Sequence, residues 1–200
     1  MILIFDYGFG NKTNLSNALS ELNIPHKISN NPKDIKDSTH IILPGVGSFG
    51  AAMKMIKNER IIDSLQDAVL KKKNLLGICL GMQLLFEGSE ESKGVSGMNF
   101  LKGKIKKIKK TKILPHIGWK KVNYKKNINF QNEFDLKEKF YFLHSYMLAT
   151  PNSYIQANTT FERQKIPAII SFESIIGVQF HPERSGRQGL KFLKDFYTAI

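Results

Sequence analysis

Short apolar runs alternate with helical patterns through the first half of the chain, and this alternation constrains the fold more than any other feature. The apolar runs have the length of buried strands, and the stretches between them place apolar residues at helical spacing. The runs cover 1–7, 26–29, 40–43 and 75–79, and the helical stretches cover 13–22, 49–57, 59–72 and 81–86. This order predicts an α/β fold in three layers: a mostly parallel central sheet with helices on both faces.

The second half has a different rhythm, in which short strand-like segments dominate from about residue 98. We expect strands at 100–109, 119–124, 140–147, 154–158, 167–172 and 175–180, and a closing helix at Gln188–Thr198. Such closely spaced strands predict a small antiparallel sheet. Lys125–Lys139 is polar and reads as a surface excursion, and no repeat or long linker interrupts the chain. Residues 1–200 therefore predict a single domain.

The net charge of +13 raises the question of nucleic-acid binding. Lysine supplies most of it, with 26 lysines against 4 arginines spread along the chain, and lysine reads bases poorly. We therefore expect a lysine-rich surface without a specific nucleic-acid partner. No run approaches the roughly 18 apolar residues of a membrane span, and MILIFDYG lacks a basic signal-peptide region. These features predict a cytoplasmic protein.

The chain contains one cysteine, Cys79. A single cysteine forms no internal disulfide, and metal sites usually need several Cys or His ligands close together, so we expect neither a metal nor a cofactor. Cys79 stands in a Gly-x-Cys-x-Gly pattern between the apolar run that starts at Leu75 and a helix start, which is the arrangement of a nucleophile elbow. There the helix N-terminus favours the thiolate, and the N–H of Leu80 is placed to stabilise an oxyanion.

A cysteine nucleophile needs a base, and the base needs an orienting group. Among five histidines, His26 and His40 begin strands and are expected to be structural. His181 follows an apolar strand and precedes Pro182 and Glu183. Because His and Glu two residues apart can point to the same side, His181 and Glu183 form the best base and orienter in the sequence.

These two segments, 77–83 and 179–183, resemble the motifs of the class I glutamine amidotransferases. They stand in the order of that family, about 100 residues apart, and the resemblance covers essentially the whole chain. It implies a glutaminase in which Cys79, His181 and Glu183 form the catalytic triad. A glutamyl thioester on the cysteine is the expected intermediate.

Five further segments narrow the resemblance to the HisH family, the glutaminase subunits of imidazole glycerol phosphate synthase. They are 6–11, 44–49, 89–91, 115–119 and 144–146. The resemblance implies a heterodimer with a HisF-like cyclase subunit that receives the ammonia for histidine biosynthesis. Carried over residue by residue, it implies oxyanion donors at Gly45, Val46 and Leu80. It places glutamine binding at Gly47, Gln83, Glu91, His144, Ser145 and Tyr146, and the partner face at Asn11, Asn14, Trp119, Tyr141 and Arg184.

Two positions depart from the HisH pattern: Lys12 replaces an apolar residue and Lys120 replaces an asparagine. Both are expected near the partner face, so they put the partner's identity in doubt and leave the triad unaffected. Two alternatives stay open. The chain is a HisH-like paralogue that supplies ammonia for amidination of a bacterial surface sugar, or it is a non-catalytic scaffold subunit.

Overall fold

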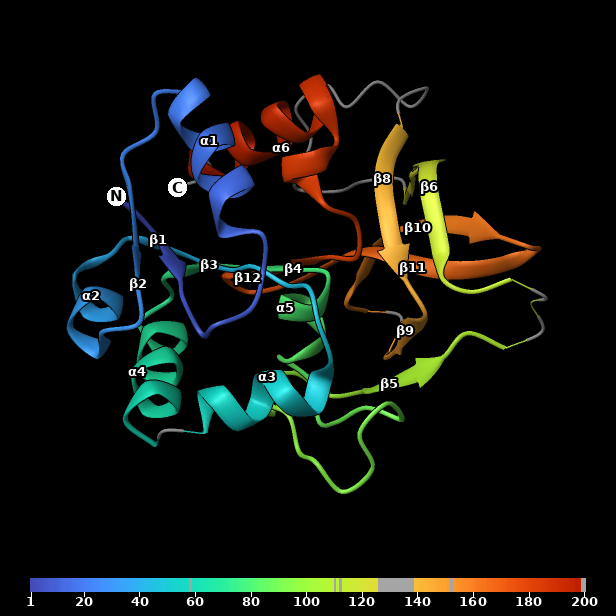
Figure 1. Ribbon diagram of the computed structural model, residues 1–200, viewed down its shortest axis with the longest axis horizontal. Helices are drawn as coiled ribbons and strands as arrows, with labels where there is room; N and C mark the ends of the chain where they lie inside the picture. Colours follow the sequence, from blue (N-terminus) through green and yellow to red (C-terminus); the bar gives the residue numbers. More distant parts are fainter. Residues whose placement is uncertain (58, 110, 112, 126–138, 152, 199–200) are drawn as a thin grey trace.

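A central eight-stranded sheet dominates the computed structural model, which describes residues 1–57, 59–109, 111, 113–125, 139–151 and 153–198 (Figure 1). In spatial order its strands are β2 (His26–Ser29), β1 (Ile2–Phe5), β3 (His40–Leu43), β4 (Asn74–Ile78), β12 (Ile175–Val178), β11 (Gln164–Phe172), β10 (Ile155–Phe161) and β7 (Asn123–Tyr124). The strands from β2 to β12 pair in parallel, and β11, β10 and β7 continue the sheet in antiparallel pairing.

Helices cover both faces of the parallel part of the sheet (Figure 1). One face carries α1 (Lys12–Glu21) and α6 (Gly186–Thr198), and the other carries α2 (Pro32–Asp37), α3 (Phe49–Ile56) and α4 (Glu59–Leu70). Successive side chains of a strand point to opposite faces, so Ile2 and Ile4 of β1 enter one apolar core while Leu3 and Phe5 enter the other. The predicted three-layer α/β fold is confirmed.

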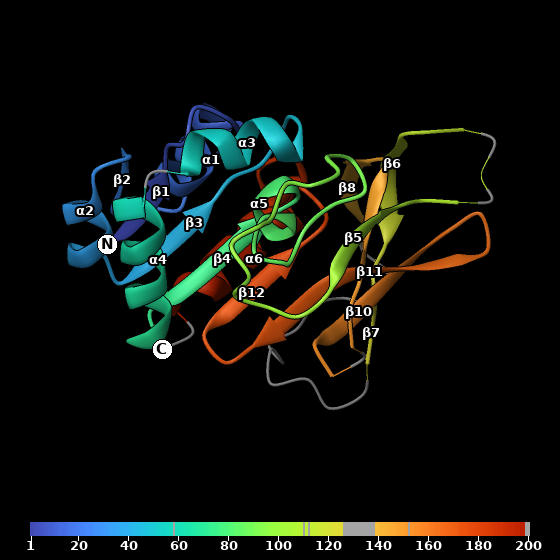
Figure 2. The same ribbon diagram turned by 90° about the horizontal axis from the view of Figure 1, so that it is seen from below.

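Two small sheets lie beside the antiparallel end of the central sheet (Figure 2). In one, β5 (Lys104–Lys107) pairs with β9 (Tyr146–Ala149), and in the other β6 (His116–Lys121) pairs with β8 (Lys139–His144). The second half therefore contributes more than one small antiparallel sheet, because its strands also extend the central sheet. Most of the predicted excursion, residues 126–138, lies outside the described residues.

Two helices differ from the sequence-based expectation. Helix α2 was not expected, although Asn31 caps it by accepting a hydrogen bond from the Lys33 N–H at 2.9 Å and Pro32 begins it. The helix after Cys79, α5, is a single turn, Leu80–Gln83, whereas the sequence predicted a longer helix over 81–86. Its dipole is correspondingly small. Among the described residues, no helix combines the length and apolarity needed to cross a membrane.

The last helix packs tightly on the 3₁₀ turn η1 (Pro182–Arg184), which follows His181. A Cβ added at Gly189 of α6 would lie 1.8 Å from the carbonyl oxygen of Pro182. Intrinsic helix propensity alone would make Gly189→Ala stabilising by about 1 kcal/mol. Here the clash separates α6 from η1, so we expect Gly189→Ala to lower the melting temperature measured by circular dichroism. Arg187→Ala, at an exposed position of the same helix, serves as the control. A higher melting temperature for Gly189→Ala would contradict this packing.

Candidate active site

Cys79 occupies a strained turn between β4 and α5. Its backbone has φ 50° and ψ −106°, a conformation that side-chain-bearing residues rarely adopt. Neighbouring glycines make the turn possible: a Cβ at Gly81 would lie 2.0 Å from the Leu43 carbonyl oxygen, and one at Gly77 would lie 2.6 Å from the Cα of Met82. The elbow predicted from the glycine pattern is thus present, and it lifts the sulfur above the carboxyl end of the sheet.

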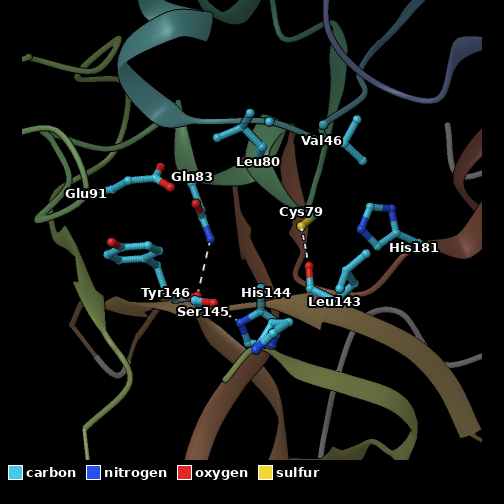
Figure 3. A pocket seen from close by; sticks show the side chains of 13 residues that line it. Val46, Cys79, Leu80, Gln83, Glu91, Leu143, His144, Ser145, Tyr146 and His181 are labelled. Atoms are coloured by element: carbon cyan, nitrogen blue, oxygen red, sulfur yellow. Dashed lines mark hydrogen bonds between the residues drawn. The ribbon is translucent and has the colours of Figure 1, made fainter. Parts of the chain in front are cut away.

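The histidine and glutamate expected beside Cys79 lie at the same edge of the sheet. Strand β12 pairs in parallel with β4, with Val178 opposite Ile78, so the residues after both strands emerge together. The Nδ1 atom of His181 lies 2.8 Å from Oε1 of Glu183, and both side chains are almost fully buried. Because a carboxylate can only accept, this bond places the proton on Nδ1. Within the described part of the chain Nε2 has no hydrogen-bond partner, and the ring lies beside the sulfur (Figure 3).

Charge around His181 favours the imidazolium form. Burial lowers the pKa of His181, but the negative charge of Cys79 and the hydrogen bond and charge of Glu183 outweigh it and raise the pKa to about 10. A histidine that remains protonated beside a thiolate is the arrangement expected of an activated cysteine nucleophile. The charged group that the structure places beside the Cys79 sulfur is thus the imidazole of His181.

Two groups around the sulfur were not expected from the sequence. The thiol faces the carbonyl oxygen of Leu143 at 3.7 Å, and Nε2 of Gln179 lies 3.5 Å from the sulfur. Gln179 also accepts a hydrogen bond from Gln83 at 3.2 Å. Gln179 directly follows β12, so the pairing of β12 with β4 would have placed it next to Cys79.

A cavity of about 240 Å³ opens in front of Cys79 and His181 (Figure 3). Every residue expected at the oxyanion hole or in glutamine binding lines it, and so do Pro115 and Leu143, which were not expected there. The expected residues are Gly45, Val46, Gly47, Leu80, Gln83, Glu91, His144, Ser145 and Tyr146. Within the described residues, no three His, Cys, Asp or Glu side chains gather as a metal site.

The loop between β3 and α3 brings backbone N–H groups to this cavity through Gly45, Val46 and Gly47. Within the described residues, none of these three N–H groups donates a hydrogen bond to the backbone, so they remain free for a ligand. Glu91 supports the far end of the loop, because its Oε2 atom accepts a hydrogen bond from the Phe49 N–H at 2.7 Å. Its other oxygen remains for the cavity that Glu91 lines.

A buried histidine pair supports the opposite wall of the cavity. Nδ1 of His144 lies 2.8 Å from the carbonyl oxygen of Tyr146, and Nε2 of His144 lies 2.9 Å from Nδ1 of His116. Because a carbonyl oxygen only accepts, both Nδ1 atoms carry the protons. His116 is fully buried between the rings of Phe142 and Phe161. These two hydrogen bonds fix the 144–146 turn, and the sequence did not show this role for His116.

The other two histidines lie away from the cavity, as expected. His40 interacts with Asn74 and contacts the rings of Phe196 and Tyr197, and His26 interacts with Ser16. The contacts of His26 and His40 are thus packing and hydrogen-bonding contacts within the fold.

Three of the residues expected at a partner face form one cluster next to the site. Trp119 of β6 is 50% exposed and meets the ring of Tyr141 edge-on, with centroids 6.1 Å apart. The guanidinium of Arg184 lies over the same tyrosine ring at 5.1 Å. Asn11 and Asn14 stand at the start of α1, a helix that packs against η1. Trp119 is thus a surface residue.

Lys12 and Lys120, the two positions that depart from the family pattern, both contact other residues of this chain. Lys12 forms an ion pair with Asp6, whose carboxylate also accepts the Gly8 N–H at 2.9 Å. Lys120 turns away from the Trp119 side of β6 and lies over the Phe161 ring at 6.0 Å. Lys120 and Trp119 point to opposite faces because alternate residues of a strand do so, and the place of Lys120 near a partner stays a prediction.

An α/β sheet with a cysteine at its elbow and a buried His–Glu pair beside it defines a cysteine-dependent hydrolase of the amidotransferase type. The model of the family described as "Glutamine amidotransferase class-I" matches residues 3–200. The chain belongs to this family and is a glutamine-hydrolysing enzyme.

Comparison with known proteins agrees with this assignment. The chain is 37% identical over 200 residues to "Imidazole glycerol phosphate synthase subunit HisH" of Bacillus cytotoxicus, covering 100% of this chain and 95% of that protein. It is 38% identical over 199 residues to the protein of the same name from Lactococcus lactis, covering 100% and 98%. Among solved structures, the fold is similar to a glutamine amidotransferase (TM-score 0.74, 14% identity, 99% and 100% covered) and to PurLQS from Thermotoga maritima (TM-score 0.74, 22% identity, 99% and 97% covered).

The raised pKa of His181 leads to a measurable prediction. Because it lies above the ordinary value of 6.5, the charged imidazole stabilises the fold fully below pH 6.5 and loses this contribution as the pH rises through about 10. Cys79→Ala removes a neighbouring negative charge, so His181 should titrate at a lower pH in that variant. Histidine NMR titration measures this directly, and His40, distant from the site, is the internal control. An identical His181 pKa in both proteins would contradict the assigned charge coupling.

The histidine pair has the opposite pH dependence. Burial, with a smaller effect from Lys120, lowers the pKa of His116 to about 4. The neutral ring therefore contributes stability that is full above pH 6.5 and is lost as the pH falls towards 4. In His116→Gln an amide N–H can still donate to His144 without titrating. We expect its melting temperature to fall less than that of the unmodified protein between pH 6.5 and 4. The melting temperature of the control, His26→Gln, should fall as much as that of the unmodified protein.

Proposed function

We propose that residues 1–200 act as one glutaminase domain in which Cys79 is the nucleophile, His181 the general base and acid, and Glu183 the group that orients His181. One observation carries the proposal: Cys79 and His181 leave the ends of two adjacent parallel strands into one cavity, with Glu183 hydrogen-bonded to the far side of the imidazole. This geometry supplies a nucleophile, a base and an orienter in the sequence that acyl transfer requires.

Before acylation, Nε2 of His181, the ring nitrogen on the Cys79 side, holds the proton of the thiol, so that a thiolate faces an imidazolium. The thiolate attacks the side-chain carbonyl carbon of glutamine, and the oxygen becomes an oxyanion. The N–H of Leu80 and an N–H from Gly45–Gly47 stabilise it. His181 then gives its proton to the leaving nitrogen, which departs as ammonia and leaves a glutamyl thioester on Cys79.

Deacylation uses the same groups with water as the nucleophile. His181 removes a proton from water, the hydroxide attacks the thioester, and glutamate leaves as the thiol is restored. Removing a single oxyanion donor typically raises such a barrier by about 3–4 kcal/mol. The free N–H groups of the 45–47 loop therefore have a large effect on the rate of hydrolysis.

Substrate binding is assigned to the remaining residues around the cavity. Glu91 offers one carboxylate oxygen to the α-ammonium group of glutamine, and the backbone of residues 144–146 faces the α-carboxylate. Gln83 reinforces that turn by donating to the Tyr146 carbonyl oxygen at 3.3 Å. Glutamate itself lacks the amide nitrogen that His181 protonates, so it is a product and not a substrate.

A pair of histidine variants tests the triad. His181→Asn should lower kcat for glutamine hydrolysis by about 10⁴-fold, since a triad without its base retains only binding and oxyanion stabilisation. Coupled glutamate release in the presence of the partner subunit measures this. His26→Asn, at the edge strand β2, should retain normal turnover. Cys79→Ala should be inactive yet folded. Normal turnover in His181→Asn, or any hydrolysis in Cys79→Ala, would overturn the assignment.

We further propose that the chain works as a HisH-type subunit in a heterodimer with a HisF-like cyclase. Its relatives named as subunits of imidazole glycerol phosphate synthase are 37% and 38% identical over nearly their full length. The cluster of exposed Trp119 and Arg184 with half-buried Tyr141, next to the cavity, is rich in the side-chain types that dominate binding energy at interfaces. It is the docking surface that the proposal assigns to the cyclase.

Two aromatic variants test that docking surface. Trp119→Ala should weaken binding to the cyclase by at least about 2 kcal/mol, as expected for a central aromatic residue of an interface. Isothermal titration of the two purified subunits measures the change. Phe172→Ala is the matched control, because Phe172 is a partly exposed aromatic on β11 away from the cavity. Equal affinities for the two variants would place the partner elsewhere on the chain.

Genetic complementation separates the histidine pathway from the amidination of surface sugars. Together with the cyclase encoded in the same genome, the chain should restore growth of a histidine auxotroph that lacks its own glutaminase subunit. The Cys79→Ala variant should not. Failure of the unmodified chain to restore growth, while glutaminase activity in the extract is normal, would favour the sugar pathway.

A further inference from the structure

The loop that carries the candidate oxyanion donors packs against a second loop, which follows β1. A Cβ at Gly10 would lie 2.8 Å from the Cβ of Pro44, and one at Gly47 would lie 2.8 Å from the ring of Phe9. Pro44 and Gly47, which flank the candidate oxyanion donors, thus lie against residues 9 and 10 of the second loop. On its other side, a Cβ at Gly45 would lie 2.3 Å from the N atom of Gly81, so the same loop is also pressed against the cysteine elbow.

One polar contact joins these two loops. The hydroxyl group of Tyr7 donates a hydrogen bond to the carbonyl oxygen of Pro44. Tyr7 is 3% exposed and lies between Phe5 and Phe9, each with a ring centroid 6.2 Å away. Burial, together with the nearby charge of Cys79, raises the pKa of Tyr7. The phenol therefore remains protonated at neutral pH and is always able to donate.

This hydrogen bond determines the direction of a peptide plane. In a trans peptide the carbonyl and the next N–H point in opposite directions, so a fixed Pro44 carbonyl also fixes the Gly45 N–H. Within the described residues, the N–H groups of residues 45–47 donate no backbone hydrogen bond. At the far end Glu91 holds the Phe49 N–H. Hydrogen bonds therefore hold both ends of the segment that supplies the second oxyanion donor.

We propose that Tyr7 is a positioning residue for glutamine hydrolysis, which acts by anchoring the Pro44–Gly45 peptide and thereby aligning the oxyanion donors of the 45–47 loop. This inference rests on the proposed function of Cys79 as the nucleophile. Tyr7 itself touches neither substrate nor sulfur in this role. The simpler interpretation is that Tyr7 only fills the core, and a phenylalanine would then serve equally well.

The test is Tyr7→Phe, which keeps the ring and removes the hydroxyl group, measured in the complex with the cyclase subunit. Misalignment of an oxyanion donor affects the transition state and not substrate binding. We therefore expect kcat for glutamine hydrolysis to fall about 10²-fold with KM changed less than about twofold. Alkylation of Cys79 by iodoacetamide needs no oxyanion hole and should proceed at the unmodified rate. Mass spectrometry follows it on this chain, whose only cysteine is Cys79.

The matched control is Tyr124→Phe, which removes the hydroxyl group of a partly buried tyrosine on β7, at the far edge of the sheet. It should leave kcat unchanged. Normal kcat in Tyr7→Phe would overturn the proposal and leave Tyr7 as a packing residue. A parallel fall in kcat and in the alkylation rate would also overturn it, because the effect would then act on the thiol.

Two further variants keep the test decisive. If Tyr7→Phe does not fold, Phe9→Leu perturbs the same loop at Gly47 and should produce the same selective fall in kcat. Its normal turnover would refute the proposal. Cys79→Ala is assayed alongside: residual hydrolysis in that variant refutes the triad itself. An inactive Cys79→Ala together with a fully active Tyr7→Phe refutes only the role of Tyr7.

Discussion

The parallel pairing of β4 with β12 is the constraint on which the site depends. These strands are about 100 residues apart in sequence, yet Leu75 lies opposite Ile175 and Ile78 opposite Val178. Without this register His181 would not lie beside Cys79, because it reaches the cavity only as the continuation of β12. The antiparallel strand β11 then lies outside β12 and buries it, which explains why the pair is embedded in the centre of the sheet. The pairing of β4 with β12 therefore both stabilises the core and positions the residues of the site.

Local sequence patterns predicted the parts of the site that depend on a few consecutive residues. The glycines around Cys79 indicated a strained turn. The structure gives the reason: a side chain at Gly81 would collide with Leu43, and one at Gly77 would collide with Met82. The spacing of His181 and Glu183 indicated a base with its orienter, and the hydrogen bond of 2.8 Å has that geometry. The central parallel strands were likewise visible as apolar runs, since both faces of such a strand are buried.

Features that depend on pairing between distant segments could not be predicted in this way. Gln179 contacts the sulfur only through the register of β12, and His116 reaches His144 only through the pairing of β6 with β8. Lys120 shows the same limit, because the face of a strand on which a residue lies is decided by its partner strand. Helix α2 was missed for a different reason: six residues are too few for a periodic pattern, and only its cap marked it.

The two halves of the site are held by different interactions. Cys79 is fixed by its strained turn, and His181 by its hydrogen bond to Glu183. The 45–47 loop has no backbone hydrogen bond at its middle peptides within the described residues, and side chains hold its ends, Tyr7 at Pro44 and Glu91 at Phe49. Its first anchor belongs to the loop that leads into α1, where Asn11 and the Asp6–Lys12 ion pair lie. The start of α1 is therefore connected to the 45–47 loop through Tyr7, and the same helix packs against η1, the segment that carries Glu183.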